Sequence, residues 1–247
     1  MLDSEKIAKI CDGWDDGRPV DWRLVGRNEL TEYCATIKTA IEKTVNNLFG
    51  INNYSCLINA EKIILLNKET FGRLGVLLWD KNCKDDLTKI EENKFNRELI
   101  DTMFNGFDGI PGNVDYNKCE CFCLYSNVMA TSYDGYIIIN IDKTESKLGL
   151  HLLCHEIFHS LASPAVVENL RKEGGNMGDE ATNEFIARLV SLENDLGCTT
   201  TVDMKLPSDE VHDETGCYGK LLKKENFRNK KPEIIKQEIS AYLSIKI

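Results

Sequence analysis

The sequence predicts an α+β fold, with a mixed α/β N-terminal lobe over residues 1–145 and a mainly helical lobe over residues 146–247. Short β-rich runs bounded by turn residues fall in the first part of the chain. From about residue 145 onward, apolar residues recur instead at the three-to-four spacing of helices. A chain of 247 residues suits one large domain or two modest ones, and we expect the two lobes to form one compact unit. We expect a cleft where the two lobes meet, which is a common place for a binding site.

Apolar spacing and turn residues divide the first lobe into helices and strands. The predicted elements are a short helix over 1–11, a longer helix over 28–49, strands over 63–66 and 76–79, a helix over 85–104 and a loop over 105–118. Gly50 is expected to end the longer helix. A hairpin follows, with strands within 119–131 and over 135–141, because Asp134-Gly135 is a tight-turn dipeptide between two β-rich runs.

The second lobe is expected to consist of helices joined by short connections. The predicted elements are a helix from Thr144 or Ser146 to about Leu161, a connection over 165–178, a helix over 179–196, a helix near 208–225 and a last helix that begins at Pro232. Proline is favoured in the first turn of a helix, and Gly197 is placed to end the helix before it.

Residues 155–159 read His-Glu-Ile-Phe-His, an HExxH sequence inside an apolar run with helical spacing. Residues four apart lie on one face of a helix, so His155 and His159 can direct their imidazoles at one metal ion. Glu156 is turned to the side, where it can reach a water on that metal. His151 lies one turn earlier on the same face, so three of the four histidines occupy this row.

The simplest alternative is a helix with two surface histidines and an ordinary glutamate. The neighbours of the motif argue against it, because they are apolar and indicate a largely buried helix: Leu148, Leu152, Leu153, Ile157, Phe158 and Leu161. Buried histidines need partners, and a metal satisfies two stacked ones. For His151 we expect a satisfied, partly buried histidine, with a contact to a ligand residue or a place in the lining of the cleft as the alternative.

A catalytic zinc site needs a third protein ligand and an open position. His212 and several carboxylates are candidates for that ligand. Glu180 and Glu184 lie four apart on one face of a predicted helix, so one could bind metal while the other hydrogen-bonds a ligand histidine. Without the upstream motif, both glutamates would be interpreted as a solvated helix face.

Over residues 135–197 the chain resembles the gluzincins, the thermolysin-like zinc metallopeptidases. In that family an HExxH helix is followed by a second helix that provides a glutamate ligand, with an acidic residue four positions further on. The resemblance implies Zn²⁺ as the cofactor, held by His155, His159 and Glu180, with Glu184 in contact with a ligand histidine. Glu184 as the third ligand is the alternative.

The resemblance also implies a zincin-like fold, in which an edge strand lies above the HExxH helix and holds an extended substrate. Residues 135–141 would be that strand. Family members use a histidine or tyrosine of the C-terminal lobe to stabilise the oxyanion, which here points to His212 or Tyr218. A surface histidine among acidic residues is the alternative for His212.

We therefore expect a zinc-dependent metallopeptidase that acts on a protein or peptide. Glu156 would take a proton from the metal-activated water and pass it to the leaving amine. Two alternatives stay open: a catalytically inactive zincin-like protein with a binding or structural role, and a metal-dependent hydrolase of non-peptide amides. The intact Glu156 argues against the first, because degenerate zincins usually lose this residue.

Composition adds limits on partners and location. The formal net charge of -10 disfavours nucleic acid and anionic membranes as partners. Residues 1–6 lack the pattern of a signal peptide, so we expect a cytoplasmic protein, with signal-independent export as the alternative. The ten cysteines are expected to be reduced. A second zinc site at Cys119, Cys121 and Cys123 is a minor alternative, because their spacing is not that of zinc ribbons.

Overall fold

The computed structural model describes residues 1–14, 20–51, 54–79, 129–133, 135–143, 149–162, 168, 178–198, 222 and 225–243. In chain order its elements are α1 (Ser4–Asp12), α2 (Arg27–Phe49), η1 (Ala60–Lys62), β1 (Ile63–Leu66), α3 (Lys68–Trp79), β2 (Ala130–Tyr133), β3 (Tyr136–Asn140), α7 (Gly149–Leu161), α9 (Gly178–Glu193), η4 (Phe227–Asn229) and α11 (Pro232–Tyr242). They build a mixed α+β fold, as predicted.

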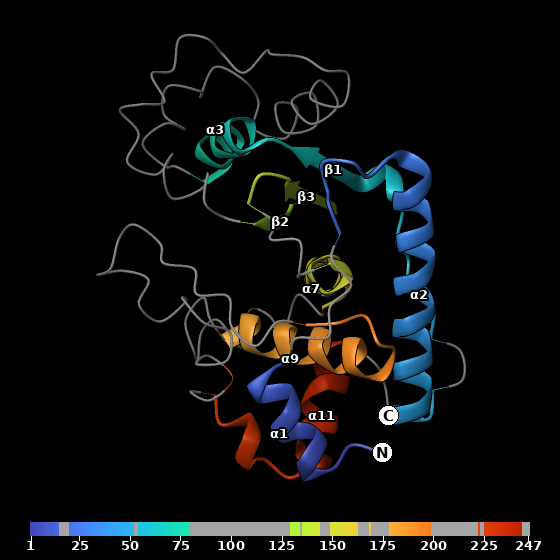
Figure 1. Cartoon of the computed structure of the whole chain (residues 1–247). Helices are drawn as coiled ribbons and strands as arrows, with labels where there is room; N and C mark the ends of the chain where they lie inside the picture. The colour runs from blue at the N-terminus through green and yellow to red at the C-terminus, as the bar shows by residue number, and fades with distance from the viewer. Residues whose placement is uncertain are drawn as a thin grey trace.

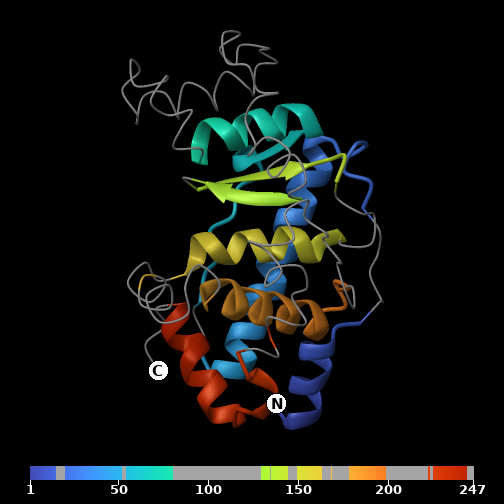
Figure 2. The same cartoon turned by 90° about the vertical axis from the view of Figure 1, so that its left-hand side faces the viewer.

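The elements are stacked in layers. From one end of the molecule to the other, Figures 1 and 2 show α3, the sheet, α7, α9, and then α1 with α11. Helix α2 runs along the side of this stack and spans several layers (Figure 1). One continuous apolar core connects α1, α2, α7, α9 and α11 with the sheet. Helix α7, which carries the HExxH sequence, therefore lies between the sheet and α9.

The sheet has three strands among the described residues, in the order β1-β3-β2. β3 pairs in parallel with β1 and antiparallel with β2. Strands 63–66 and 135–141 were predicted and are found, but the prediction that 135–141 is an edge strand is wrong, because β3 is central. All five residues of β3 are buried, and a run of β-branched side chains suits a strand that is covered on both faces.

Two features of the hairpin and sheet follow from turn chemistry. Gly135 has φ 76°, a conformation that glycine adopts at little cost, and it begins the return into β3. Tyr133 then lies opposite Tyr136 in the register of the two strands. Of the predicted first hairpin strand within 119–131, residues 119–128 lie outside the described residues.

The predicted strand over 76–79 is wrong, because these residues end helix α3. The helix starts where Asn67 accepts a hydrogen bond from the backbone N–H of Thr70 at 2.8 Å, which is N-terminal capping. Phe71 and Leu74, three residues apart, are both buried. A short apolar run fits a buried helix as well as a strand, and the cap at Asn67 favours the helix.

The other described helices agree with the predicted ones. Helix α2 ends at Gly50, which has φ 69° and donates a hydrogen bond to the carbonyl of Asn46. Pro232 is the first residue of α11, and Asp3 caps α1. Among the described residues, no helix is both long and apolar enough to cross a membrane.

Several predicted elements cannot be compared with the structure. The helix over 85–104 and the loop over 105–118 lie outside the described residues. The same holds for most of the connection over 165–178 and of the helix near 208–225. All described elements that follow β3 are helical, which agrees with the predicted change of composition near residue 145.

Candidate metal centre

Helix α7 brings two imidazoles together on the side that faces α9. The Nε2 atoms of His155 and His159 lie 3.3 Å apart. The apolar side chains of α7 hold these histidines within the protein, because Leu153, Ile157 and Phe158 are buried on the other sides of the helix. His155 is itself only 4% exposed. Because the apolar side chains of α7 are buried on the other sides of the helix, the two rings point toward α9.

Glu180, in the first turn of α9, completes a compact set of donor atoms. Its Oε2 atom lies 3.4 Å from His155 Nε2, and its Oε1 atom lies 3.4 Å from His159 Nε2. A tetrahedral zinc ion with ligands at about 2.0–2.1 Å requires neighbouring ligand atoms to be about 3.3–3.4 Å apart. The observed separations are close to this value, each distance to Glu180 ends on a different oxygen, and the three residues could hold a metal ion.

Glu184, one turn further along α9, contacts the other nitrogen of the same imidazole. Its Oε2 atom lies 2.8 Å from His155 Nδ1. An ionised carboxylate only accepts hydrogen bonds, so Nδ1 carries a proton, and Nε2 is the nitrogen directed toward His159 and Glu180. The geometry thus separates the two glutamates: Glu180 belongs to the donor set, whereas Glu184 orients a ring of that set.

Helix α9 also fixes the backbone of the histidine helix. The side-chain amide of Asn183 donates to the carbonyl oxygen of His155 at 3.0 Å. Asn183 and Glu184 are adjacent, so one pair of residues holds both the backbone and the ring of His155. Every residue of α9 from 181 to 191 is buried, so the alternative interpretation as a solvated helix face is wrong for Glu184.

The charges of the donor set depend on one another. Burial on its own lowers the pKa of His155 and His159, but hydrogen bonds to Glu180, and for His155 also to Glu184, outweigh burial and raise both pKa values. Burial on its own raises the pKa of Glu180, but its hydrogen bonds to the two histidines lower it far below the usual range. The set therefore keeps an ionised carboxylate beside two imidazoles that carry protons. A metal cation can displace these protons when it binds.

Glu156 is buried beside this set and is chemically distinct from it. Its side chain follows His155 by one residue, so it projects to another side of α7. Burial raises the pKa of Glu156, although the neighbouring His155 and His159 oppose this change. A raised pKa brings a carboxylate closer to the range in which it can both take and give a proton near neutral pH.

His151, Ser191 and Arg188 extend the site away from the donor set, and of these only His151 was considered from the sequence. His151 lies 3.2 Å from Glu184 Oε1 through Nε2 and 3.1 Å from Ser191 Oγ through Nδ1. Arg188 Nε donates to Glu184 Oε1 at 2.5 Å. The sequence signal that points to His151, and that could have pointed to Arg188, is their spacing of four residues from site residues, His155 for the first and Glu184 for the second. His151 is satisfied, as expected, but it is fully rather than partly buried.

His151, Glu184 and Cys198 also bring potential metal ligands close together. Arg188 already supplies a positive charge to Glu184, and a second cation there would be repelled by it. His151 further uses both of its ring nitrogens in contacts with protein groups. The arrangement therefore fits a hydrogen-bonded network better than a second metal site.

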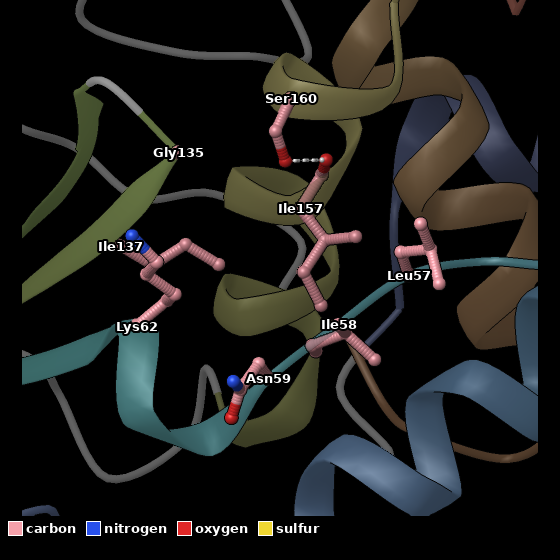
Figure 3. A pocket seen from close by; sticks show the side chains of 8 residues that line it. All are labelled: Leu57, Ile58, Asn59, Lys62, Gly135, Ile137, Ile157 and Ser160. Atoms are coloured by element: carbon pink, nitrogen blue, oxygen red, sulfur yellow. Dashed lines mark hydrogen bonds between the residues drawn. The ribbon is translucent and has the colours of Figure 1, made fainter.

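A small cavity lies on a different side of α7 (Figure 3). It has a volume of about 200 Å³, and its lining comes from α7, β3 and the segment that leads into β1: Leu57, Ile58, Asn59, Lys62, Gly135, Ile137, Ile157 and Ser160. Ile157 follows His155 by two residues, which turns its side chain by about 200° on a helix. The cavity is therefore separated from the donor set by the body of the helix.

His212 and Tyr218, the predicted oxyanion-stabilising residues, lie outside the described residues, as do Cys119, Cys121 and Cys123. Comparisons with models of protein families, with curated proteins and with solved structures gave no match. The interpretation of the site therefore rests on the HExxH sequence and on the geometry of His155, His159 and Glu180.

Proposed function

We propose that the protein is a zinc-dependent metallopeptidase with His155, His159 and Glu180 as its metal ligands. The observation that carries the proposal is the spacing of the three donor groups, 3.3 Å between the imidazoles and 3.4 Å from each to the carboxylate. Each distance is close to the separation of about 3.3–3.4 Å between ligand atoms of a tetrahedral zinc site, and the two distances to Glu180 end on different oxygens. The fourth position of such a site is open to water or substrate in catalytic zinc centres.

The chain supplies the remaining chemistry through side chains in fixed positions. Zinc bound in such a site would act as a Lewis acid and make water nucleophilic near neutral pH. Glu156, with its raised pKa, takes the proton of the attacking water and gives it to the leaving amine. Because Glu184 accepts a hydrogen bond from Nδ1 of His155, Nε2 is the nitrogen of this ring that would bind the metal. His212 or Tyr218 remains our proposal for stabilising the oxyanion.

Strand β2 is the proposed support for a peptide substrate. Among the described residues β1 and β2 form the two edges of the sheet, and β2 packs against α7. An edge strand offers unpaired backbone groups that can bind an extended peptide. A peptide bound there would lie alongside the helix that carries Glu156.

The decisive test compares the wild-type protein with Glu156→Gln. We expect both to bind one equivalent of zinc, measured by mass spectrometry of metal content, and the variant to cleave a peptide library about 10²–10⁴-fold more slowly. Equal cleavage by the variant would contradict the role of Glu156. Zinc binding without cleavage of any peptide by the wild type would instead favour an inactive zincin-like protein or a hydrolase of non-peptide amides.

A further inference from the structure

Arg188 connects the site to the N-terminal helix. Its Nε atom donates to Glu184, and its Nη1 atom donates to the carbonyl oxygen of Ile10 at 3.0 Å and reaches that of Cys11 at 3.5 Å. Arg188 is only 2% exposed. One guanidinium group therefore bridges two elements that are far apart in the sequence, α1 and α9.

The positive charge of Arg188 has a negatively charged or partly negative partner on each side. A buried arginine needs compensation for its lost hydration, and ionised Glu184 gives the opposite charge. The carbonyls of Ile10 and Cys11 belong to the last turn of α1, where a helix has unpaired acceptors and the negative end of its dipole. Because a guanidinium group is a planar fork, it can bind both partners at once.

Helix α1 is held firmly against α9 at this place. Ile7, Ile10 and Cys11 are its buried residues, and Lys6 makes an ion pair with Glu193 at the end of α9. Figure 1 shows α1 beside α9, on the side away from α7. The contacts form a continuous line from the α1 carbonyls through Arg188 and Glu184 to the ring of His155.

We propose that Arg188, held by the C-terminal end of α1, is a positioning residue for the metal site. This inference rests on the proposed function. The two carboxylate oxygens of Glu184 are shared among His151, His155 and Arg188. Without Arg188, the carboxylate can rotate away from His155 Nδ1 toward His151. The ring of His155 would then lose the contact that fixes its orientation and tautomer. Removal of such outer partners typically weakens metal binding about 10–100-fold.

The first test measures the zinc dissociation constant by chelator competition in wild type, Arg188→Lys and Lys6→Met. Lysine keeps the charge but lacks the fork, so we expect zinc to bind Arg188→Lys about 10–100-fold more weakly. Lys6→Met breaks a partly exposed α1–α9 ion pair that does not touch Glu184, and it should keep the wild-type constant. The absorption spectrum of bound Co²⁺ should change in Arg188→Lys alone, since its bands follow the ligand geometry.

The second test needs only the wild-type protein, so it does not depend on how well a variant folds. Coupling between two sites is reciprocal, so zinc must also stabilise the docking of α1. We expect zinc to slow amide hydrogen exchange in residues 4–12 more than in residues 232–242 of α11, which also packs on α9. The α11 amides report any general stabilisation of the fold.

The outcomes separate this inference from the function on which it rests. A wild-type protein that binds no zinc overturns both. A wild type that binds zinc, with an unchanged constant in Arg188→Lys and equal slowing of exchange in α1 and α11, overturns the role of Arg188 and leaves the proposed metal site standing. Weaker zinc binding in Arg188→Lys together with selective slowing in α1 supports the inference.

Discussion

Glu184 Oε2 lies 2.8 Å from Nδ1 of His155, while the Oε2 atom of Glu180 lies 3.4 Å from Nε2 of the same ring. The two glutamates are one helical turn apart and approach opposite nitrogens of one imidazole. A histidine that donates from Nδ1 to a carboxylate has its Nε2 lone pair free for a metal. The two carboxylates are thus expected to have different effects on metal binding.

The first prediction distinguishes the third ligand by a pair of matched variants. We expect Glu180→Gln to lose stoichiometric zinc, because a donor atom of the tetrahedral set is replaced by a weaker one. Glu184→Gln should still bind one zinc, about 10–100-fold more weakly than wild type. Metal content after dialysis and chelator competition measure these effects. The reverse order of the two variants would make Glu184 the ligand.

The second prediction concerns the pH dependence of zinc binding and of stability. Without metal, the pKa values of His155 and His159 are raised above the usual 6.5, so the stability from their contacts with Glu180 is present below that pH. This stability is lost as the pH rises through the raised values. Zinc must displace the same protons, so its affinity should increase over the same rise in pH.

Thermal unfolding at several pH values, with chelator and with excess zinc, measures this difference directly. The metal-free protein is expected to become less stable above about pH 6.5. The additional stability that zinc binding provides is expected to increase over the same range. Calorimetry in buffers of different ionisation enthalpy should also detect proton release on zinc binding. A zinc affinity that does not change with pH would contradict protonated histidines in the metal-free site.

The third prediction tests the central strand. Ile138 lies in the middle of β3 and is 0% exposed. Ile138→Ala is expected to lower the free energy of unfolding by about 2–5 kcal/mol, because it leaves a cavity beside both neighbouring strands. Ile234, on α11, is 44% exposed, and Ile234→Ala should change the same quantity by less than about 0.5 kcal/mol. Urea denaturation measures both, and similar losses would contradict the central place of β3.

The fourth prediction concerns two buried thiols. Burial raises the pKa of Cys34 to about 11 and, together with the charge of Glu42, that of Cys56 to about 12. Because the thiolate is the reactive form, both should resist alkylation in the native protein near neutral pH. Peptide mass spectrometry after a short alkylation pulse, with and without denaturant, measures each cysteine separately. Rapid labelling of Cys56 in the native protein would contradict this prediction, because it would show that the buried thiol becomes exposed easily.

The donor set was predictable because its residues are linked by local periodicity. Spacings of four residues place His155 above His159 and Glu180 above Glu184, and each helix could be located from its apolar pattern. What the pattern left open was which glutamate faces which nitrogen. That depends on how α9 crosses α7, which is set by packing between helices rather than by either sequence segment.

The parts that could not be predicted depend on contacts between distant segments. Strand β3 is central because β1, which precedes it by about 70 residues, pairs with it in parallel, and no local pattern encodes such a pairing. The role of Arg188 likewise requires the carbonyl of Ile10 from the other end of the chain. The helix over 76–79 differs from these cases, because the local sequence contains a signal for it in Asn67, which caps the helix.

The bridge between α1 and Arg188 also has a consequence for the order of events during folding. Helix α1 has nine residues, and isolated helices shorter than about 12–15 residues are marginal in water. Its partner α9 begins only at Gly178, far along the chain from α1. Helix α1 is therefore expected to become stable only after α9 has been made. Closure of this long loop is slow compared with local folding, so the ability to bind metal should appear late, together with the docking of α1.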